Sequence, residues 1–320
     1  MSKSRKTSKS IDDKLQDTPS PGQVKALKRQ VADLQKALDA LRSSKFVLPT
    51  GKRTRSKKGS YTRVIIPDTH GCLLDKTAWR AFMTDLEAIQ PAEIVWLGDH
   101  LDCGGFLAQH HTANYVAQTE YTFADDAAAA NAQLDAVLKA VPGATHHYLE
   151  GNHERRIETF IATSTVRNER DAKYLRQIFS PEVVLGIEDR GVNYYKQSTC
   201  YHDLEIPNII KLGRCYFTHG IFTSKNAAKA HVDEYACNIV YGHTHRADSY
   251  VRRTIDSTIA AHNPGCLCRT QKLYMHSRNT HHTHGYGLQA VQGNGDFLHI
   301  NVPIIKGKSL LQPLASGVVS

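Results

Sequence analysis

Apolar positions between residues 61 and 149 follow two alternating patterns. Short apolar runs that end in a polar turn alternate with segments that have a helical pattern. The runs are typical of buried strands and are YTRVII at the start of YTRVIIPDTHG, EIVWL (93–97) and THHYL (145–149). The helical segments are residues 76–89 and the alanine-rich residues 124–140. This alternation predicts a largely parallel sheet flanked by helices.

The pattern changes in the second half of the chain. Residues 153–179 have a helical pattern, and residues 225–236 form one further helical stretch. Most other apolar residues lie in short strand-like segments, namely NIIKLG, RCYFTHG, CNIVYGHTH, SYVRRT, GLQAVQG and FLHINVPII. We expect these late strands to form a second sheet that packs against the first.

The first sixty residues are organised differently from the rest. Residues 1–20 are rich in Ser, Lys and Asp without an apolar pattern, so we expect a disordered basic tail. Ser20-Pro21 supplies an N-cap and a first-turn proline, which predicts an amphipathic helix over residues 21–44. A basic linker is expected over residues 45–60, and a single domain over residues 61–320.

The predicted N-terminal helix carries an apolar stripe with heptad spacing. Its steps of three and four residues join Val24, Leu27, Val31, Leu34, Leu38 and Leu41. The stripe covers only about two and a half heptads, fewer than a secure coiled-coil assignment needs. Two interpretations therefore stay open. Residues 24–41 form a coiled coil that makes a homo-oligomer, or the helix lies on its own domain.

The positive charge of the chain is concentrated near its N-terminus. Residues 1–60 hold 16 of the 40 Lys and Arg and 5 of the 31 Asp and Glu, a net charge of +11. The remaining 24 basic and 26 acidic residues give −2, so the predicted domain is nearly neutral. Residues 50–60 are either a solvated linker or a contact for nucleic acid or another acidic surface. They contain no aromatic residue that would stack on bases.

Cysteine usage and hydropathy indicate a cytoplasmic protein. The seven cysteines are odd in number and form no CxxC pair, which is typical of free thiols in a reducing compartment. No run of about 18 apolar residues is present, so we expect no membrane span. The charged N-terminus is not followed by the apolar region of a secretory signal. We therefore predict a cytoplasmic location, which is the host cytoplasm if the gene is viral.

Histidine, aspartate and asparagine gather at the predicted strand ends. Five blocks contain them: Asp68-Thr69-His70, Gly98-Asp99-His100-Leu101-Asp102, Gly151-Asn152-His153-Glu154, Thr218-His219-Gly220 and Gly242-His243-Thr244-His245. Ligand sites in open α/β sheets form at the carboxyl ends of strands, so these loops are expected to converge. Their oxygen and imidazole donors suit Mn²⁺, Fe, Zn²⁺ or Mg²⁺.

Together the five blocks resemble the signature of the calcineurin-like metallophosphoesterases, which runs D-x-H, G-D-x-x-D, G-N-H-[E/D], H and G-H-x-H. All five are present in order over residues 68–245, so the resemblance covers most of residues 61–304 and none of residues 1–60. It implies an α/β fold, a four-layer αββα sandwich of two mixed sheets, here with an N-terminal helical extension.

The resemblance also implies ligands for two divalent metal ions, with manganese favoured. One ion would be held by Asp68, His70, Asp99 and His245. The other would be held by Asp99, Asn152, His219 and His243, with Asp99 bridging the two. Ions in such sites lie about 3.5–4 Å apart and turn a bridging water into a hydroxide that attacks phosphorus.

Residues beside the ligands are implied to act on the substrate. His153 would stabilise or protonate the leaving oxygen, and Asp102 would hydrogen-bond His153 and hold its tautomer. Arg155 or Arg156 could bind a substrate phosphate, although either could equally be a solvated charge. Glu154 either orients its loop or is a carboxylate at a helix start.

Some residues depart from the family pattern or fall outside it. Phosphoprotein phosphatases of this superfamily continue the second block as Asp-Arg-Gly, whereas Cys103 stands in the place of that arginine here. The final block instead favours the nuclease, phosphodiesterase and small-phosphatase branches. His110-His111 and His146-His147 are expected to be surface or hydrogen-bonded residues, and the 281–284 cluster is either similar or borders the site.

The sequence thus predicts a dinuclear metal-dependent phosphoesterase whose substrate stays open. A nuclease or phosphodiesterase and a phosphomonoesterase, acting on proteins or small molecules, both fit. The basic N-terminal segment favours nucleic acid as a partner, whereas the near-neutral domain is unlike one whose own groove binds DNA. A non-catalytic nucleic-acid-binding or scaffold protein is a minor alternative, and the intact ligand set argues against it.

Overall fold

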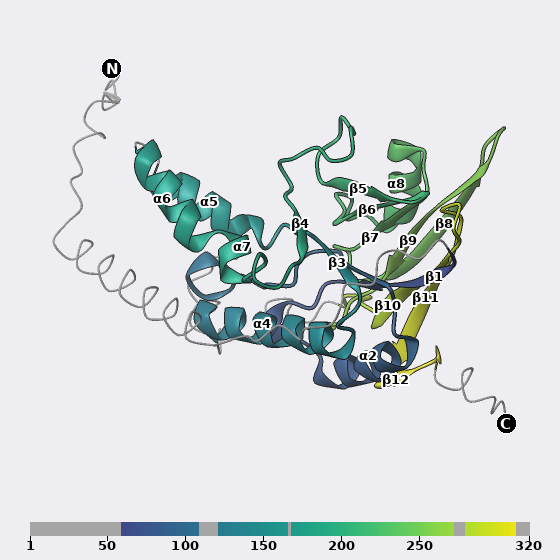
Figure 1. The fold of residues 1–320 in the computed structure, drawn as a ribbon, viewed down its shortest axis with the longest axis horizontal. Helices are drawn as coiled ribbons and strands as arrows, with labels where there is room; N and C mark the ends of the chain where they lie inside the picture. Colours follow the sequence, from purple (N-terminus) through teal and green to yellow (C-terminus); the bar gives the residue numbers. More distant parts are fainter. Residues whose placement is uncertain (1–58, 109–120, 166–167, 272–278, 312–320) are drawn as a thin grey trace, which may run out of the picture. The chain divides into compact units, whose positions relative to one another are not determined.

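Two β-sheets and the helices around them make up the part of the chain that the computed structural model describes (Figure 1). That part comprises residues 59–108, 121–165, 168–271 and 279–311, all within one compact unit, Val47–Ser320. The predicted tail, the amphipathic helix and almost all of the linker lie outside these residues, so the coiled-coil and nucleic-acid hypotheses stay predictions. His110 and His111 lie outside them as well.

The first sheet has seven strands in the order β12-β11-β10-β1-β2-β3-β4. Four neighbouring strands are parallel: β1 (Tyr61–Ile66), β2 (Glu93–Trp96), β3 (Thr145–Leu149) and β4 (Asn193–Tyr195). The others pair antiparallel: β10 (Gly285–Val291), β11 (Phe297–Ile305) and β12 (Lys308–Ser309). The sheet is therefore mixed, and the polar turns after β1, β2 and β3 leave it at the same edge.

The expectation that all late strands belong to the second sheet is wrong for β10 and β11, and β12 was not predicted. Strand β10 pairs with β1, with Tyr61 opposite Val291, and β11 then pairs with β10. The alternation of apolar residues in a strand reports which face is buried and not which neighbour it pairs with. The pairing of the first strand with segments near the end of the domain was therefore not visible in the sequence pattern.

The second sheet has five strands in the order β5-β6-β7-β9-β8. They are β5 (Ile209–Leu212), β6 (Cys215–Thr218), β7 (Ile239–Tyr241), β8 (Ala247–Arg253) and β9 (Thr258–Pro264). Strands β6, β7 and β9 are parallel, and β5 and β8 add antiparallel edges. Strand β9 was missed because its sequence, TIAAHNP, consists mostly of small and polar residues.

Helices cover the outer faces of the two sheets. Helices α2 (Lys76–Ile89) and α4 (Phe123–Ala140) lie on the first sheet, where Phe82 of α2 packs against Tyr286 of β10 (Figure 1). Helix α8 (Ala227–Tyr235) packs on the second sheet, against Ile239 and Tyr241 among others. The order helix, sheet, sheet, helix confirms the predicted four-layer αββα sandwich.

The predicted helical segment 153–179 is divided into two helices. They are α5 (Arg155–Ser164) and α6 (Glu169–Phe179), followed by the short α7 (Pro181–Val184). The Asn168 side chain accepts hydrogen bonds from the backbone N–H groups of Arg170 and Asp171, at 3.1 and 3.2 Å, and so begins a new helix. Two short 3₁₀ helices, η2 (Gly71–Leu73) and η3 (Gly105–Leu107), lie in the turns after β1 and β2.

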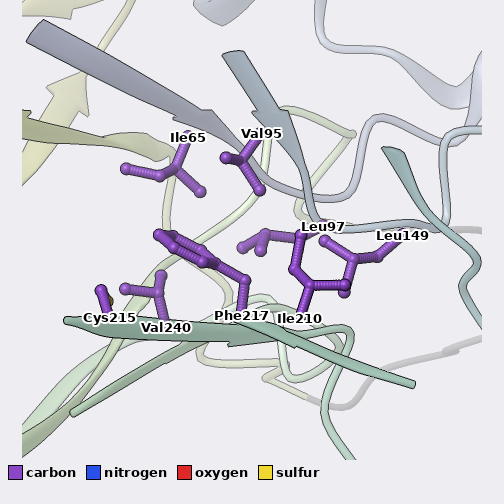
Figure 2. Close-up of a cluster of buried hydrophobic side chains, with 8 residues drawn as sticks. All are labelled: Ile65, Val95, Leu97, Leu149, Ile210, Cys215, Phe217 and Val240. Carbon is purple, nitrogen blue, oxygen red and sulfur yellow. The ribbon is translucent and has the colours of Figure 1, made fainter. Parts of the chain in front are cut away.

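The core that fixes the two sheets relative to each other lies between them (Figure 2). Side chains of one sheet and its turns face those of the other, all fully buried: Ile65, Val95, Leu97 and Leu149 against Ile210, Cys215, Phe217 and Val240. Burying one such Leu, Ile or Phe side chain contributes roughly 1.5–3 kcal/mol. This packing holds the strand ends of both sheets at fixed positions, and those ends carry the polar blocks.

Candidate metal centre

The polar turns of the first sheet meet those of the second at the carboxyl ends of their parallel strands. The backbone N–H of His243, after β7, donates to the Asp68 carboxylate, after β1, at 3.0 Å. Nδ1 of His219, after β6, lies 2.8 Å from the carbonyl oxygen of Leu97, after β2. The site is thus built jointly by both sheets, as parallel strands with converging loops predict.

One group of predicted ligands is fully enclosed. The ligand atoms of Asp68, His70, Asp99 and His245 all lie within 4.8 Å of one another, and all four residues are buried. Nε2 of His245 is 3.0 Å from Nε2 of His70 and 3.4 Å from Oδ1 of Asp68. Nε2 of His70 is 3.9 Å from Oδ2 of Asp99.

A second group lies on the other side of Asp99. Nε2 of His219 is 2.8 Å from Oδ1 of Asn152, 3.2 Å from Nδ1 of His243 and 3.4 Å from Oδ2 of Asp99. Asn152 and His243 are partly exposed, so this side faces solvent. The structure therefore brings all seven predicted ligands together, with the Asp99 carboxylate between the two groups.

The donor set fits divalent cations. The ring nitrogens of the histidines point toward one another, and two carboxylates and one amide oxygen lie among them. Sites for Mn²⁺, Fe, Zn²⁺ and Mg²⁺ use such a mixture of donors. A single carboxylate between two groups of imidazoles can serve two cations because it has two oxygens.

Four of the predicted ligands have a left-handed backbone. The φ angles are 51° at His70, 51° at Asp99, 69° at His243 and 56° at His245. Non-glycine residues rarely adopt this region, at a cost of about 1–3 kcal/mol each, and such residues cluster at functional sites. The conformation turns each side chain back toward the site at the end of its strand. The sequence pattern did not predict this left-handed conformation.

Two glycines allow the turns to approach closely. A Cβ on Gly242 would lie 2.7 Å from Oδ2 of Asp68, and one on Gly151 would overlap the backbone of Asp99. Gly151 and Gly242, which begin the third and the fifth blocks, are therefore required by contact between neighbouring loops.

The buried Glu154 is the N-cap of α5, but its side chain makes no capping bond there and orients the loops instead. Its carboxylate accepts hydrogen bonds from four backbone N–H groups and one hydroxyl, between 2.7 and 3.0 Å. The donors are Asp99, His100, Leu101, Gly151 and the Tyr148 hydroxyl. One carboxylate thus joins the second and third blocks.

A second buried carboxylate, Asp126 of α4, was missed by the sequence analysis. It accepts from the backbone N–H groups of Cys72, Asp102 and Cys103, at 3.1, 3.0 and 2.9 Å, and so joins the first and second blocks. Burial and the nearby Asp102 charge raise the pKa of Asp126 to about 7. The available signal was an acidic residue on the apolar face of an alanine-rich helix.

The side chain of Asp102 contacts a different histidine from the one expected. Its Oδ1 is 2.8 Å from Nδ1 of His70 but 3.5 Å from Nδ1 of His153. Nδ1 of His153 instead lies 2.6 Å from the backbone carbonyl oxygen of Asp102. Tyr121, which the sequence did not single out, donates its hydroxyl to the other Asp102 oxygen. Asp102 therefore holds His70 with its carboxylate and His153 with its backbone.

The two arginines after the third block point in different directions. Arg156 is buried and lies 3.0 Å from Nε2 of His153 and 3.0 Å from the Asp102 carbonyl oxygen. Arg155 is exposed and donates to Gln197 at 3.3 Å. Only Arg156 therefore brings a guanidinium to the residues around His153.

The electrostatics separate the buried histidines into two kinds. Burial alone would lower the pKa of His219 and His245, but Asp99 raises it to about 9 for His219, and Cys268 and Asp68 raise it to about 10 for His245. Burial lowers the pKa of His153 to about 3, against the pull of Asp99. His219 and His245 thus carry protons near neutral pH in the metal-free chain, whereas His153 is neutral.

The other histidine clusters have varied positions. His146 and His147 of β3 are buried away from the ligands, and His147 bonds the Tyr195 hydroxyl at 2.8 Å. His282 borders the site, since its ring centroid lies 4.7 Å from that of His245. His284 bonds the carbonyl oxygen of Cys268 at 2.9 Å.

Comparisons with known proteins find similar solved structures but no similar sequence family. No protein-family model matches the sequence, and no curated protein matches it. Among solved structures, vacuolar protein sorting 29 from Cryptosporidium parvum matches at 14% identity and a TM-score of 0.38, over 78% of this chain and 95% of that chain. The phosphoesterase Yfce from E. coli matches at 14% identity and a TM-score of 0.33, over 75% of this chain and 98% of that chain.

These matches are too distant to support a conclusion about activity. The layers, the strand order and the ligand positions, taken by themselves, are consistent with the calcineurin-like metallophosphoesterase fold that the motifs resemble. Among the described residues, no helix is both long enough and apolar enough to span a membrane.

Proposed function

We propose that this chain is a dinuclear metal-dependent phosphoesterase. The observation that supports it most is the convergence of seven side chains from five loops around the Asp99 carboxylate, four of them on left-handed backbone. Asp68, His70, Asp99 and His245 would hold one divalent cation. Asp99, Asn152, His219 and His243 would hold the other. A bound pair of cations supplies an activated water and neutralises charge on phosphoryl oxygens.

The residues around the ligands set which ring nitrogen faces the site. A carboxylate can only accept, so His70 donates its Nδ1–H to Asp102 and turns the lone pair of Nε2 toward the site. His219 likewise donates its Nδ1–H to the Leu97 carbonyl oxygen. Such partners orient ligand imidazoles and raise their basicity.

His153 and Arg156 form the part of the site that would meet the substrate. His153 donates Nδ1–H to the Asp102 carbonyl oxygen, so its Nε2 accepts from Arg156 at 3.0 Å. Arg156 also contacts that carbonyl oxygen, one residue before Cys103, and so places a guanidinium beside the position at which the phosphatases carry theirs. A phosphoryl oxygen that binds Arg156 would free Nε2 of His153, which could then take up a proton from solvent and deliver it to the leaving oxygen.

The proposal is tested by a substrate panel on the purified full-length protein. After chelation and reloading with Mn²⁺, hydrolysis is measured with bis(p-nitrophenyl) phosphate, p-nitrophenyl phosphate, and single- and double-stranded DNA. We expect metal-dependent turnover of at least one substrate, and the preference for diester or monoester assigns the class. Absence of turnover on all four with Mn²⁺, Fe²⁺, Zn²⁺ and Mg²⁺ would refute the proposed activity.

A nucleic-acid substrate has its own test. Replacing the basic residues at positions 52, 53, 55, 57 and 58 by Gln removes charge from the linker and leaves the described domain unchanged. If the segment binds nucleic acid, cleavage of DNA weakens, with a smaller dependence on salt, while hydrolysis of the two nitrophenyl substrates is unaffected. Equal changes on all substrates would exclude a role specific to nucleic acid.

A further inference from the structure

Cys268 lies beside His245 and is also close to His70, because the ligand atoms of these three residues all lie within 4.8 Å of one another. Its sulfur is 3.8 Å from Nδ1 of His245. Nε2 of the same ring faces His70 at 3.0 Å and Asp68 at 3.4 Å. The sulfur therefore contacts Nδ1 of the ring whose Nε2 faces His70 and Asp68, and all of these residues are buried.

We propose that Cys268 is a positioning residue for the metal ligand His245. The inference rests on the proposed function, because that function requires His245 to bind a cation through Nε2. A neutral imidazole has a single N–H, so binding through Nε2 places the hydrogen on Nδ1. The sulfur of Cys268 is then the acceptor that receives it and fixes the plane of the ring.

The other two ligands that present Nε2 have the same arrangement with different acceptors. Nδ1 of His70 faces the Asp102 carboxylate at 2.8 Å, and Nδ1 of His219 faces the Leu97 carbonyl oxygen at 2.8 Å. At His245 the corresponding partner is a sulfur. Each of the three rings thus has a partner at Nδ1, which supports the same role for the acceptor at each.

The backbone around Cys268 is tied to the loop that carries the first ligands. Leu267 donates its N–H to the Asp68 carbonyl oxygen at 2.9 Å, and Arg269 donates to the Leu73 carbonyl oxygen at 2.8 Å. Cys268 itself forms an isolated bridge with Leu74. Contacts on both sides of the cysteine hold it in register with Asp68 and His70, as a positioning role requires.

The test is a Co²⁺ titration of the full-length protein, followed by absorption, for the unsubstituted chain and for Cys268→Ala and Cys268→Ser. Cys266→Ala is the matched control, because Cys266 is equally buried two residues away and its sulfur faces the Cys268 carbonyl oxygen at 3.6 Å. Loss of such a partner typically weakens metal binding 10- to 100-fold. We expect that loss in Cys268→Ala for one of two Co²⁺ equivalents, with the other unchanged.

The serine variant keeps a hydrogen-bond acceptor, so its affinity is expected to lie between those of the alanine variant and the unsubstituted chain. If the alanine variant does not fold, the serine variant still tests whether Cys268 supports metal binding by His245. Equal affinities in the Cys268 variants and the Cys266 control would overturn the inference, and so would equal weakening of both equivalents. A thiolate-to-cobalt charge-transfer band in the unsubstituted chain would also overturn it, because the sulfur would then be a ligand itself.

Failure of the inference is distinguishable from failure of the proposed function. If the unsubstituted chain binds no Co²⁺, both are refuted. If it binds two equivalents and Cys268→Ala binds them equally well, the metal site stands and only the role of Cys268 is lost.

Discussion

Nε2 of His70 and Nε2 of His245 lie 3.0 Å apart, although the two residues are separated by 175 positions in the sequence. Two bare lone pairs would repel at this distance, so a proton or a cation must lie between them. His70 already has its hydrogen on Nδ1, opposite the Asp102 carboxylate. The shared proton therefore belongs to His245, and a bound cation would replace it.

Metal binding is accordingly expected to strengthen as the pH rises. In the metal-free chain the pKa of His219 is raised to about 9 and that of His245 to about 10, so both rings are protonated near neutral pH. A cation must displace both protons, and the apparent affinity should rise up to about tenfold per pH unit for each proton until the pH passes these pKa values. Calorimetry in buffers of different ionisation enthalpy counts the released protons, and binding without proton release would contradict the assignment.

Asp99→Asn is expected to abolish binding of both cations and with it the hydrolysis. The amide keeps the shape but removes the negative charge that faces His70, His153 and His219 at 3.4 to 3.9 Å. The loss should exceed the roughly 100-fold that removal of a ligand's partner causes. Metal content by mass spectrometry provides the measurement. Asp233→Asn is the control, because it removes the same charge from an exposed residue paired with Lys229 and Arg252.

His153→Ala is expected to keep both cations and to lose rate. His153 clusters with His70 and Asp102, but, unlike His70, it is not a predicted metal ligand. Removing a group that transfers or holds a proton typically lowers kcat by about 10²- to 10⁴-fold. Steady-state kinetics with a metal-content measurement tests this, and a variant that loses metal in proportion to activity would make His153 a ligand instead.

Arg156→Met is expected to raise KM for phosphate esters and to lower kcat, whereas Arg155→Met should change neither by more than about twofold. The two residues are neighbours with the same charge, but only Arg156 is buried against His153. Loss of a charged hydrogen bond costs about 1.5–3 kcal/mol, or roughly 10- to 150-fold in kcat/KM. Equal effects of the two substitutions would point to a general loss of positive charge.

Glu154→Gln is expected to destabilise the fold by about 3 kcal/mol. The new amide group must face backbone N–H groups, so at least two of the five hydrogen bonds become contacts between donors. Urea unfolding of the metal-free protein measures the change. Glu158→Gln serves as the control, because its exposed ion pair with Arg176 contributes at most about 1 kcal/mol. Similar losses in both variants would argue against the orienting role.

Much of the fold and of the ligand set was accessible from the sequence, because both depend on local pattern. Helix α2 begins and ends where its apolar spacing predicts, and the five polar blocks follow β1, β2, β3, β6 and β7. The polar ends of buried parallel strands have one place to converge. The proximity of Asp68, Asp99 and His243 could therefore be predicted from the sequence.

What escaped the sequence depends on contacts between distant segments. These contacts, which have no periodicity of their own, are the pairing of β10 with β1, the carboxylate of Asp126 bound to two loops and the sulfur of Cys268 beside His245. Nor does a motif state which atom of Asp102 faces which histidine. Its carboxylate contacts His70 and its backbone carbonyl oxygen contacts His153.

The order of synthesis gives the pairing of β1 with β10 a consequence for the newborn protein. Asp68, Asp99 and Asn152 leave the ribosome early, but β1 stays an open edge until residues 285–291 emerge and pair with it. A product cut short before β10 would keep this edge of β1 unpaired, and an exposed strand edge is prone to aggregate with other chains.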